Sequence, residues 1–122
     1  MPPVEPLSNA SVHVITSSIS KAELSEIAKE TFEVMVKAVV DVEKRIMAVG
    51  GELHADANAV LLERGSRPQD LWGINLYPGK SSDWIEYIAL INLKPAAGNR
   101  SMQIKDPALR KRIEEIVSSL IP

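Results

Sequence analysis

Apolar residues recur in steps of three, four and seven between residues 20 and 50, and this spacing predicts a helix over about residues 20–49. Ser20 and Glu23 have the spacing of a capping box, in which each side chain accepts a hydrogen bond from the other residue's free backbone N–H. Gly50 and Gly51 would end the helix, because glycine readily adopts the left-handed conformation just past a helix end. The predicted stripe consists of Leu24, Ile27, Ala28, Thr31, Met35, Ala38, Val39, Val42, Ile46 and Val49.

The predicted helix is long for a chain of 122 residues. It would measure about 43 Å, which exceeds the expected width of the domain. The helix is therefore either broken in two or apolar on a second face. That second face indicates either a deeply buried helix or the interface of a homodimer. Its residues are Phe32, Val34, Val36 and Val40.

Four shorter segments, 11–16, 52–62, 71–77 and 84–93, have the patterns that are typical of strands. The links between the last three are short and contain Gly, Pro, Ser and Asp, which are the residues expected in turns. Short links favour antiparallel pairing of consecutive strands, because parallel strands need a long crossover. We therefore expect a small antiparallel meander.

A second helix is predicted at the C-terminus, after an irregular polar segment over residues 94–106. Asp106 has the position of an N-cap, and Pro107 is suited to the first helical position. The resulting order is β-α-β-β-β-α. The predicted class is α+β: an antiparallel sheet of three to four strands, with the long N-terminal helix and the C-terminal helix on one face. The apolar face of the second helix consists of Leu109, Ile113, Ile116, Val117 and Leu120.

Length, composition and charge narrow the class of protein. The chain fits one domain, which we expect over residues 11–122 behind a flexible arm at residues 1–10. Cysteine is missing, which excludes disulfides and thiolate chemistry and fits a cytoplasmic location. The formal charge of -2 argues against nucleic acid as a partner, and no apolar run approaches the roughly 20 residues that cross a membrane.

Polar side chains share one side of the strand predicted over residues 52–62. If the strand registers agree, they join others on one face of the sheet. This face is either the solvated side of an antiparallel sheet or a groove in which carboxylates raise the pKa of a histidine. Such a groove could serve acid–base chemistry or bind a divalent metal through one imidazole and two carboxylates. Alternate strand residues stand about 7 Å apart, too far for all three to reach one ion without a bulge, so the spacing is a weak metal signal. We predict no metal and no cofactor. The face would contain Glu52, His54, Asp56, Asn58, Asn75, Tyr77, Glu86 and Asn92.

The segment "AAGNRS" at residues 96–101 is the second candidate. Asn99 and Ser101 offer neutral hydrogen bonds, and Arg100 offers a planar fork that suits a carboxylate or a phosphate. The alternative is a structural loop whose polar side chains bind its own backbone, with Arg100 paired to an acid such as Glu86. The segment lacks the glycine spacing and the lysine of a phosphate-binding loop.

The motifs "GELHADA", "LWG" followed by "YP", and "GNRS" resemble the domain of unknown function 5674 family of small bacterial proteins. The resemblance covers about residues 15–121 and implies a fold without implying a reaction. The segment before "GNRS" is usually more polar in this family. Here it has Ala89, Lys94, Ala96 and Ala97, so a pocket lined by that segment would be impaired or retuned.

These features favour a binding or interaction module that self-associates as a homodimer and takes a small polar or anionic ligand. In this hypothesis Arg100 holds the anion, and His54 orients the ligand together with Glu52 and Asp56. The rival hypothesis is a small hydrolase or nuclease-like enzyme with His54 as acid or base and Arg100 as charge stabiliser. The third is a structural subunit whose long helix is its interface. The predicted ligand-binding set is Glu52, His54, Asp56, Asn75, Tyr77, Asn99, Arg100 and Ser101.

Overall fold

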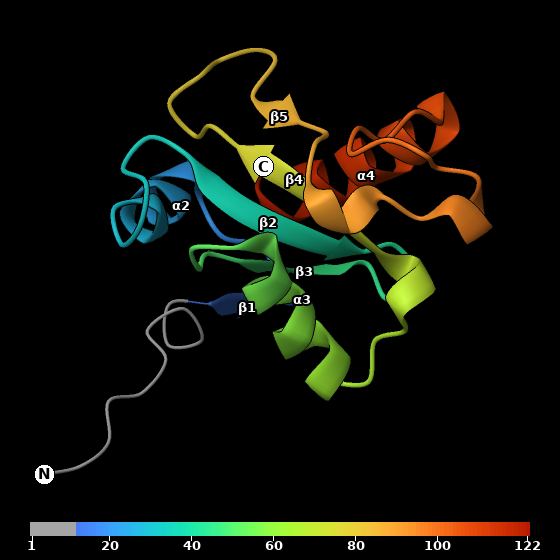
Figure 1. Ribbon diagram of the computed structural model, residues 1–122. Coiled ribbons are helices and arrows are strands. Elements are labelled where there is room, and N and C mark those ends of the chain that lie inside the picture. Colours follow the sequence, from blue (N-terminus) through green and yellow to red (C-terminus); the bar gives the residue numbers. More distant parts are fainter. Residues whose placement is uncertain (1–11) are drawn as a thin grey trace, which may run out of the picture.

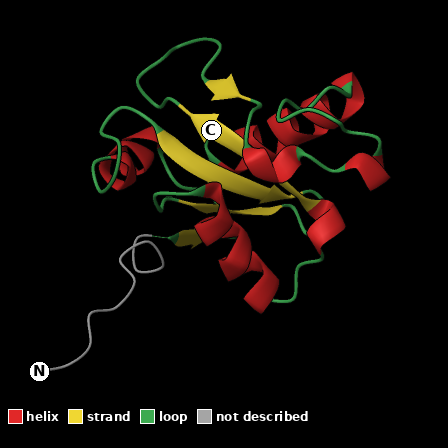
Figure 2. Ribbon diagram, in the orientation of Figure 1, coloured by secondary structure: helices red, strands yellow, loops and turns green. Residues whose placement is uncertain are grey.

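The computed structural model describes residues 12–122, which form one antiparallel sheet covered by helices on both faces (Figure 1). The sheet has the order β1-β3-β2-β4-β5. Three α-helices and three single-turn 3-10 helices connect or cover the strands (Figure 2). The strands are β1 (His13–Ile15), β2 (Val36–Asp41), β3 (Ile46–Val49), β4 (Leu71–Leu76) and β5 (Ile85–Glu86). The α-helices are α2 (Lys21–Ala28), α3 (His54–Glu63) and α4 (Pro107–Leu120).

The predictions of an α+β class, an antiparallel sheet and a C-terminal helix are confirmed. The carboxylate of Asp106 caps α4 by accepting a hydrogen bond from the backbone N–H of Ala108 at 2.9 Å. The capping box at the start of α2 is also present: the Ser20 hydroxyl accepts from the Glu23 N–H at 3.0 Å, and Glu23 accepts in return from the Ser20 N–H at 3.2 Å. The predicted strands at 11–16 and 71–77 correspond to β1 and β4, and the predicted arm at 1–10 lies outside the described residues.

The prediction of one helix over residues 20–49 is wrong, because only the eight residues Lys21–Ala28 are helical. The helix ends at Ala28, a turn follows in which Glu33 has a left-handed φ of 69°, and the chain then forms the hairpin of β2 and β3. Asp41 turns the hairpin by accepting hydrogen bonds from the backbone N–H groups of Glu43 and Lys44, both at 2.9 Å. Strand β2 lies at the centre of the sheet and buries both of its faces. Its nearly continuous apolar run therefore also contains the helical steps of three and four.

The prediction of a strand over residues 52–62 is also wrong, because this segment forms α3. Alanine is the strongest helix former, and the segment has three alanines. The carboxylate of Asp56 accepts a hydrogen bond from the Leu53 N–H at 3.0 Å and so caps the first turn. Ala57 and Leu61, one turn apart, are the residues that α3 buries against the sheet. The polar stripe therefore belongs to a helix, and the order is β-α-β-β-α-β-β-α.

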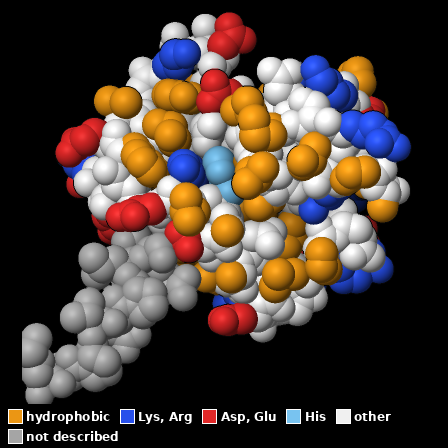
Figure 3. Space-filling model, in the orientation of Figure 1, with side chains coloured by type: hydrophobic (Ala, Val, Ile, Leu, Met, Phe, Trp, Pro, Cys, Tyr) orange, Lys and Arg blue, Asp and Glu red, His pale blue; other side chains and the backbone are white. Residues whose placement is uncertain are grey.

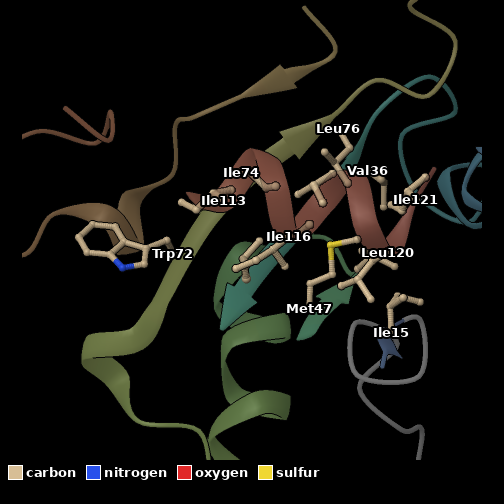
Figure 4. Close-up of a cluster of buried hydrophobic side chains, with 14 of the residues drawn as sticks. Ile15, Val36, Met47, Trp72, Ile74, Leu76, Ile113, Ile116, Leu120 and Ile121 are labelled. Atoms are coloured by element: carbon tan, nitrogen blue, oxygen red, sulfur yellow. The ribbon is translucent and has the colours of Figure 1, made fainter. Parts of the chain in front are cut away.

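Helices cover both faces of the sheet, which corrects the prediction that they share one face. Helix α4 and helix α2 pack on one face and bury the larger core (Figure 4). In that core Ile113, Ile116 and Leu120 of α4 meet Met47 and Ile74 of the sheet. Helix α3 covers the other face with a smaller cluster (Figure 1). The members of the smaller cluster are Val39, Ala48, Ala57, Leu61 and Leu71.

Only Ile85 and Glu86 of the strand predicted over 84–93 pair as a strand. Beyond them the side chain of Asn92 takes over the pairing with β4. Its Oδ1 accepts from the Gly73 N–H at 2.7 Å, and its Nδ2 donates to the Gly73 carbonyl at 2.9 Å. The chain passes so close that a Cβ on Gly73 would lie 2.5 Å from the Cβ of Ala89. The following segment is irregular, as predicted.

The proposed second face of the long helix does not exist as a surface. Val36 and Val40 are fully buried in β2, whereas Phe32 and Val34 are exposed in the loop before it. The four residues on which the prediction of a homodimer was based therefore do not form one surface. Self-association stays an untested prediction. Within residues 12–122 no helix combines the length and the apolar character that a membrane crossing requires.

Candidate functional site

His54 is the first residue of α3, and its ring lies against β4. The ring nitrogen Nε2 is 2.8 Å from the carbonyl oxygen of Ile74. Carbon Cδ2 is 3.2 Å from the place that a Cβ on Gly73 would occupy. The glycine therefore gives the imidazole room to lie on the strand, and the hydrogen bond fixes its orientation.

These two contacts settle which nitrogen of His54 is free. A carbonyl only accepts, so Nε2 carries the hydrogen of this bond. In a five-membered ring Nδ1 is the corner opposite the edge formed by Cδ2 and Nε2, so Nδ1 points away from β4. Among the described residues no group donates a hydrogen bond to Nδ1. In the neutral imidazole Nδ1 therefore presents an unused lone pair.

The environment of His54 favours the neutral form. Burial lowers the pKa of the imidazole, and the positive charge of Lys37 lowers it further. The hydrogen bond to the Ile74 carbonyl and the nearby side chain of Asn75 act in the opposite direction without reversing the shift. The predicted increase in pKa from Glu52 and Asp56 is wrong, because the helix turns these side chains elsewhere. Glu52 is exposed and Asp56 binds the backbone of Leu53.

A cleft of about 270 Å³ opens beside His54, between the start of α3 and the 3-10 turn Leu90–Asn92. Its walls are mostly apolar. Two of the apolar residues that line it are unusually exposed for their type: the exposed fraction is 58% for Leu53 and 70% for Leu90. Figure 3 shows hydrophobic side chains gathered around a histidine and a basic side chain on the face that carries α3. The lining residues are Lys37, Leu53, His54, Ala55, Leu90 and Ile91.

Lys37 supplies the positive charge of the cleft. It lies on β2 directly opposite Asn75 of β4, on the face of the sheet that α3 covers. Its ammonium is 5.1 Å from the centroid of the Phe32 ring, which is a cation–π contact. Within residues 12–122 no carboxylate lies within ion-pair distance of Lys37. The cleft thus contains a half-buried cation without an anionic partner.

A short polar chain runs from the cleft toward β5. The Nδ2 of Asn75 donates to Glu86 at 2.8 Å, and the Tyr77 hydroxyl donates to the same carboxylate oxygen at 3.3 Å. Burial, with help from Glu86, raises the pKa of Tyr77. The Oδ1 of Asn75 is buried without a hydrogen bond. The Asn75 side chain lies close enough to His54 to oppose, in part, the lowering of its pKa. The predicted site residues His54, Asn75 and Tyr77 are therefore neighbours.

The loop at residues 96–101 matches the structural alternative. The Nδ2 of Asn99 lies within hydrogen-bonding distance of three carbonyl oxygens, those of Asn92, Ser101 and Gln103, at 2.7, 2.9 and 3.0 Å. The Ser101 hydroxyl accepts from the Gln103 N–H at 3.1 Å. These polar groups hold the loop together. Because they already have hydrogen-bond partners within the loop, they are not free to bind a ligand.

Arg100 is exposed, and in the part of the chain that the structure describes no hydrogen bond or ion pair joins it to His54. The alternative pairing with Glu86 is also missing there, because the described contacts of Glu86 go to Asn75 and Tyr77. The predicted convergence of Arg100 and His54 thus has no contact to support it.

The sequence reasoning missed Lys37, Leu90 and Ile91. Lys37 was placed inside the predicted helix, although it is the one charged residue in the otherwise apolar run over residues 34–40. A single lysine in such a run indicates a half-buried position. Leu90 and Ile91 were predicted as the end of a strand. The neighbouring residues give no turn signal that would predict the 3-10 helix Leu90–Asn92.

A larger hollow of about 430 Å³ lies at the edge beyond β5. Lys80 stacks on Tyr77 at 5.2 Å and Arg110 stacks on Tyr87 at 4.9 Å. The charges that line it balance, because Asp83 and Glu86 accompany the two cations. The residues 12–122 place no three histidine or carboxylate side chains where they could share a metal ion.

Residues 13–120 match a family described as "Protein of unknown function (DUF5674)". The chain belongs to this family. The resemblance seen in "GELHADA", "LWG…YP" and "GNRS" is therefore confirmed, and the family contributes no activity to the interpretation of the cleft. No curated protein and no solved structure matches the chain. The function has to be argued from the cleft itself.

Proposed function

We propose that this member of the family is a binding module for a small amphipathic anion, which it holds in the cleft beside His54. The observation that carries the proposal is Lys37, a half-buried cation without a carboxylate partner among the described residues, at the rim of an apolar cleft. A ligand carboxylate would bind Lys37, and an apolar chain would cover Leu53, Leu90 and Ile91. The sequence motifs alone point to Arg100 as the anion-binding residue, and we assign that role to Lys37.

The apolar walls support a ligand with a hydrocarbon part. Monomeric proteins rarely leave large apolar side chains exposed side by side unless they bind something. Leu53 and Leu90 face the same cleft and are each more than half exposed. An apolar ligand chain that removed them from water would add about 25 cal/mol per Å² of buried area.

The size of the cleft limits the ligand. Pockets for drug-sized molecules usually measure about 300–1,000 Å³. At about 270 Å³ the cleft suits a short-chain carboxylate rather than a nucleotide. The start of α3 favours an anion as well, because the helix dipole is positive there, although Asp56 already offsets part of it.

Calorimetric titration with 4-methylpentanoate tests the proposal. We expect measurable binding to the unmodified protein and a loss of about tenfold or more in Lys37→Met, because charge-assisted hydrogen bonds contribute about 1.5–3 kcal/mol. Methionine keeps the apolar stem of the side chain. Lys80→Met is the matched control, since Lys80 stacks on a tyrosine at a similar distance, 5.2 Å, outside the cleft.

Equal weakening in both variants would show that only the overall charge matters, and this would overturn the proposal. No binding to the unmodified protein at millimolar ligand would do the same.

The rival hypothesis, a hydrolase or nuclease-like enzyme, needs His54 and Arg100 to act on one substrate. The free Nδ1 of His54 suits an acid–base group, but no described contact brings Arg100 to it. We therefore rank the enzyme second. Self-association as a homodimer and a cytoplasmic location stay predictions.

A further inference from the structure

We infer that the ligand of this cleft is a short 2-hydroxy carboxylate, and that Nδ1 of His54 accepts a hydrogen bond from its hydroxyl group. The inference rests on the proposed function, because it specifies the ligand of the same cleft. It adds a second recognised group, next to the carboxylate, and names the atom that recognises it.

The geometry of the imidazole carries the first step. Nε2 is committed to the Ile74 carbonyl at 2.8 Å, and Cδ2 faces Gly73. Nδ1 is therefore the only ring nitrogen available to a ligand, and it points away from the sheet. A ring that keeps its hydrogen on Nε2 offers a lone pair at Nδ1, which accepts hydrogen bonds and cannot donate them.

A simple carboxylate leaves this acceptor unsatisfied. Carboxylate oxygens also only accept, so an oxygen placed next to Nδ1 would meet another lone pair. A hydroxyl on the adjacent carbon removes the conflict, because it donates to Nδ1 while the carboxylate reaches Lys37. Lys37 and His54 both line the cleft, and Lys37 is close enough to lower the pKa of the ring.

The charged groups around His54 determine how the site responds to pH. Lys37 faces the ring from β2, and Glu86 on β5 is separated from it by Asn75. Glu52 and Asp56 flank it in the chain, and Asp56 binds the Leu53 N–H. The turn that packs opposite contributes Leu90 and Ile91, which do not titrate. Lys37 and the ring itself thus control the affinity near neutral pH.

The experiment compares two ligands that differ by one hydroxyl group: 2-hydroxy-4-methylpentanoate and 4-methylpentanoate. Calorimetry at pH 7.5 should show the hydroxy acid binding about tenfold more tightly, which is the effect of one good buried hydrogen bond. The preference should disappear in His54→Phe. As the pH falls and the imidazole protonates, Nδ1 becomes a donor, so the preference of the unmodified protein should shrink.

Three outcomes decide between the proposals. If neither acid binds, the proposed function itself fails. If both bind equally at pH 7.5, the anion site stands and the assignment of Nδ1 is overturned. If the hydroxy acid is preferred and the preference grows at lower pH, the imidazolium donates to the ligand, and the assignment is again overturned. The pH series uses the unmodified protein, so it remains decisive even if His54→Phe fails to fold.

Discussion

The two faces of the sheet differ in how completely helices cover them. On one face α4 and α2 close over a large core, in which Met47, Ile74 and Ile116 are fully buried. On the other face α3 buries only a small cluster and leaves the cleft at its first turn open. The long amphipathic stripe of α4 explains the closed face. The open face shows that α3 covers only part of the sheet, so Lys37 and His54 stay accessible.

The largest difference between the faces should appear on truncation of their apolar side chains. Ile116→Ala removes fully buried methyl groups from the closed face and should lower the free energy of unfolding by about 4 kcal/mol. Leu90→Ala on the open face should change it by less than about 0.5 kcal/mol, because 70% of this side chain is exposed. Urea unfolding measures both values. Similar costs at the two positions would remove the distinction between the faces.

Asn92 holds the open face together through a side chain instead of a strand. Asn92→Ala leaves the N–H and carbonyl of Gly73 without their partner and should lower the free energy of unfolding by about 2–3 kcal/mol. Asn58→Ala serves as control, because no hydrogen bond is described for this half-buried side chain of α3. A small effect at Asn92 would mean that water replaces its amide, and that the pairing is not structural.

Gly73 tests how closely the segment beyond β5 and the ring of His54 pack on β4. A Cβ at Gly73 would lie 2.5 Å from Ala89 and 3.2 Å from His54, so Gly73→Ala should cost about 2 kcal/mol and displace the imidazole. Gly79→Ala should be nearly neutral, since nothing lies within 4 Å of its Cβ. Thermal unfolding gives the costs. A neutral Gly73→Ala would contradict the close packing of the ring on the strand.

The smallest expected effect is the pH dependence of stability that comes from His54. Burial and Lys37 lower the pKa of folded His54 below the ordinary histidine value of 6.5, so below that pH the unfolded chain takes up a proton that the folded protein binds more weakly. Stability should therefore fall as the pH drops through 6.5 toward the folded pKa, by at most about 1.4 kcal/mol per pH unit. The slope should be shallower in His54→Gln, and an unchanged slope would place the titration elsewhere.

The sequence predicted the elements with strong local signals. Asp106 and Pro107 mark the start of α4, and the turn residues around β4 isolate a strand between them. It could not separate β2 and β3 from a helix, because a central strand buried on both faces has apolar residues at nearly every position. Only tertiary pairing decides that case.

Part of the candidate site was predictable, and the part in β2 was not, because β2 was assigned to a helix. His54, Asn75 and Tyr77 were identified as polar residues of one region, and they are neighbours. Their partner Lys37 was hidden in the misassigned helix. Arg100 was chosen as the anion-binding residue from the chemistry of its side chain alone. The sequence does not determine how far the loop places it from His54.

The most direct test of the central claim is a ¹H–¹⁵N NMR titration of the protein with 2-hydroxy-4-methylpentanoate. We predict that chemical shifts change at Leu53, Ala55, Leu90 and Ile91, and that the same changes need about tenfold more ligand, or more, in Lys37→Met. Changes confined to the hollow beyond β5, around Lys80 and Arg110, would contradict it, because the anion would then bind at the other end of the polar chain.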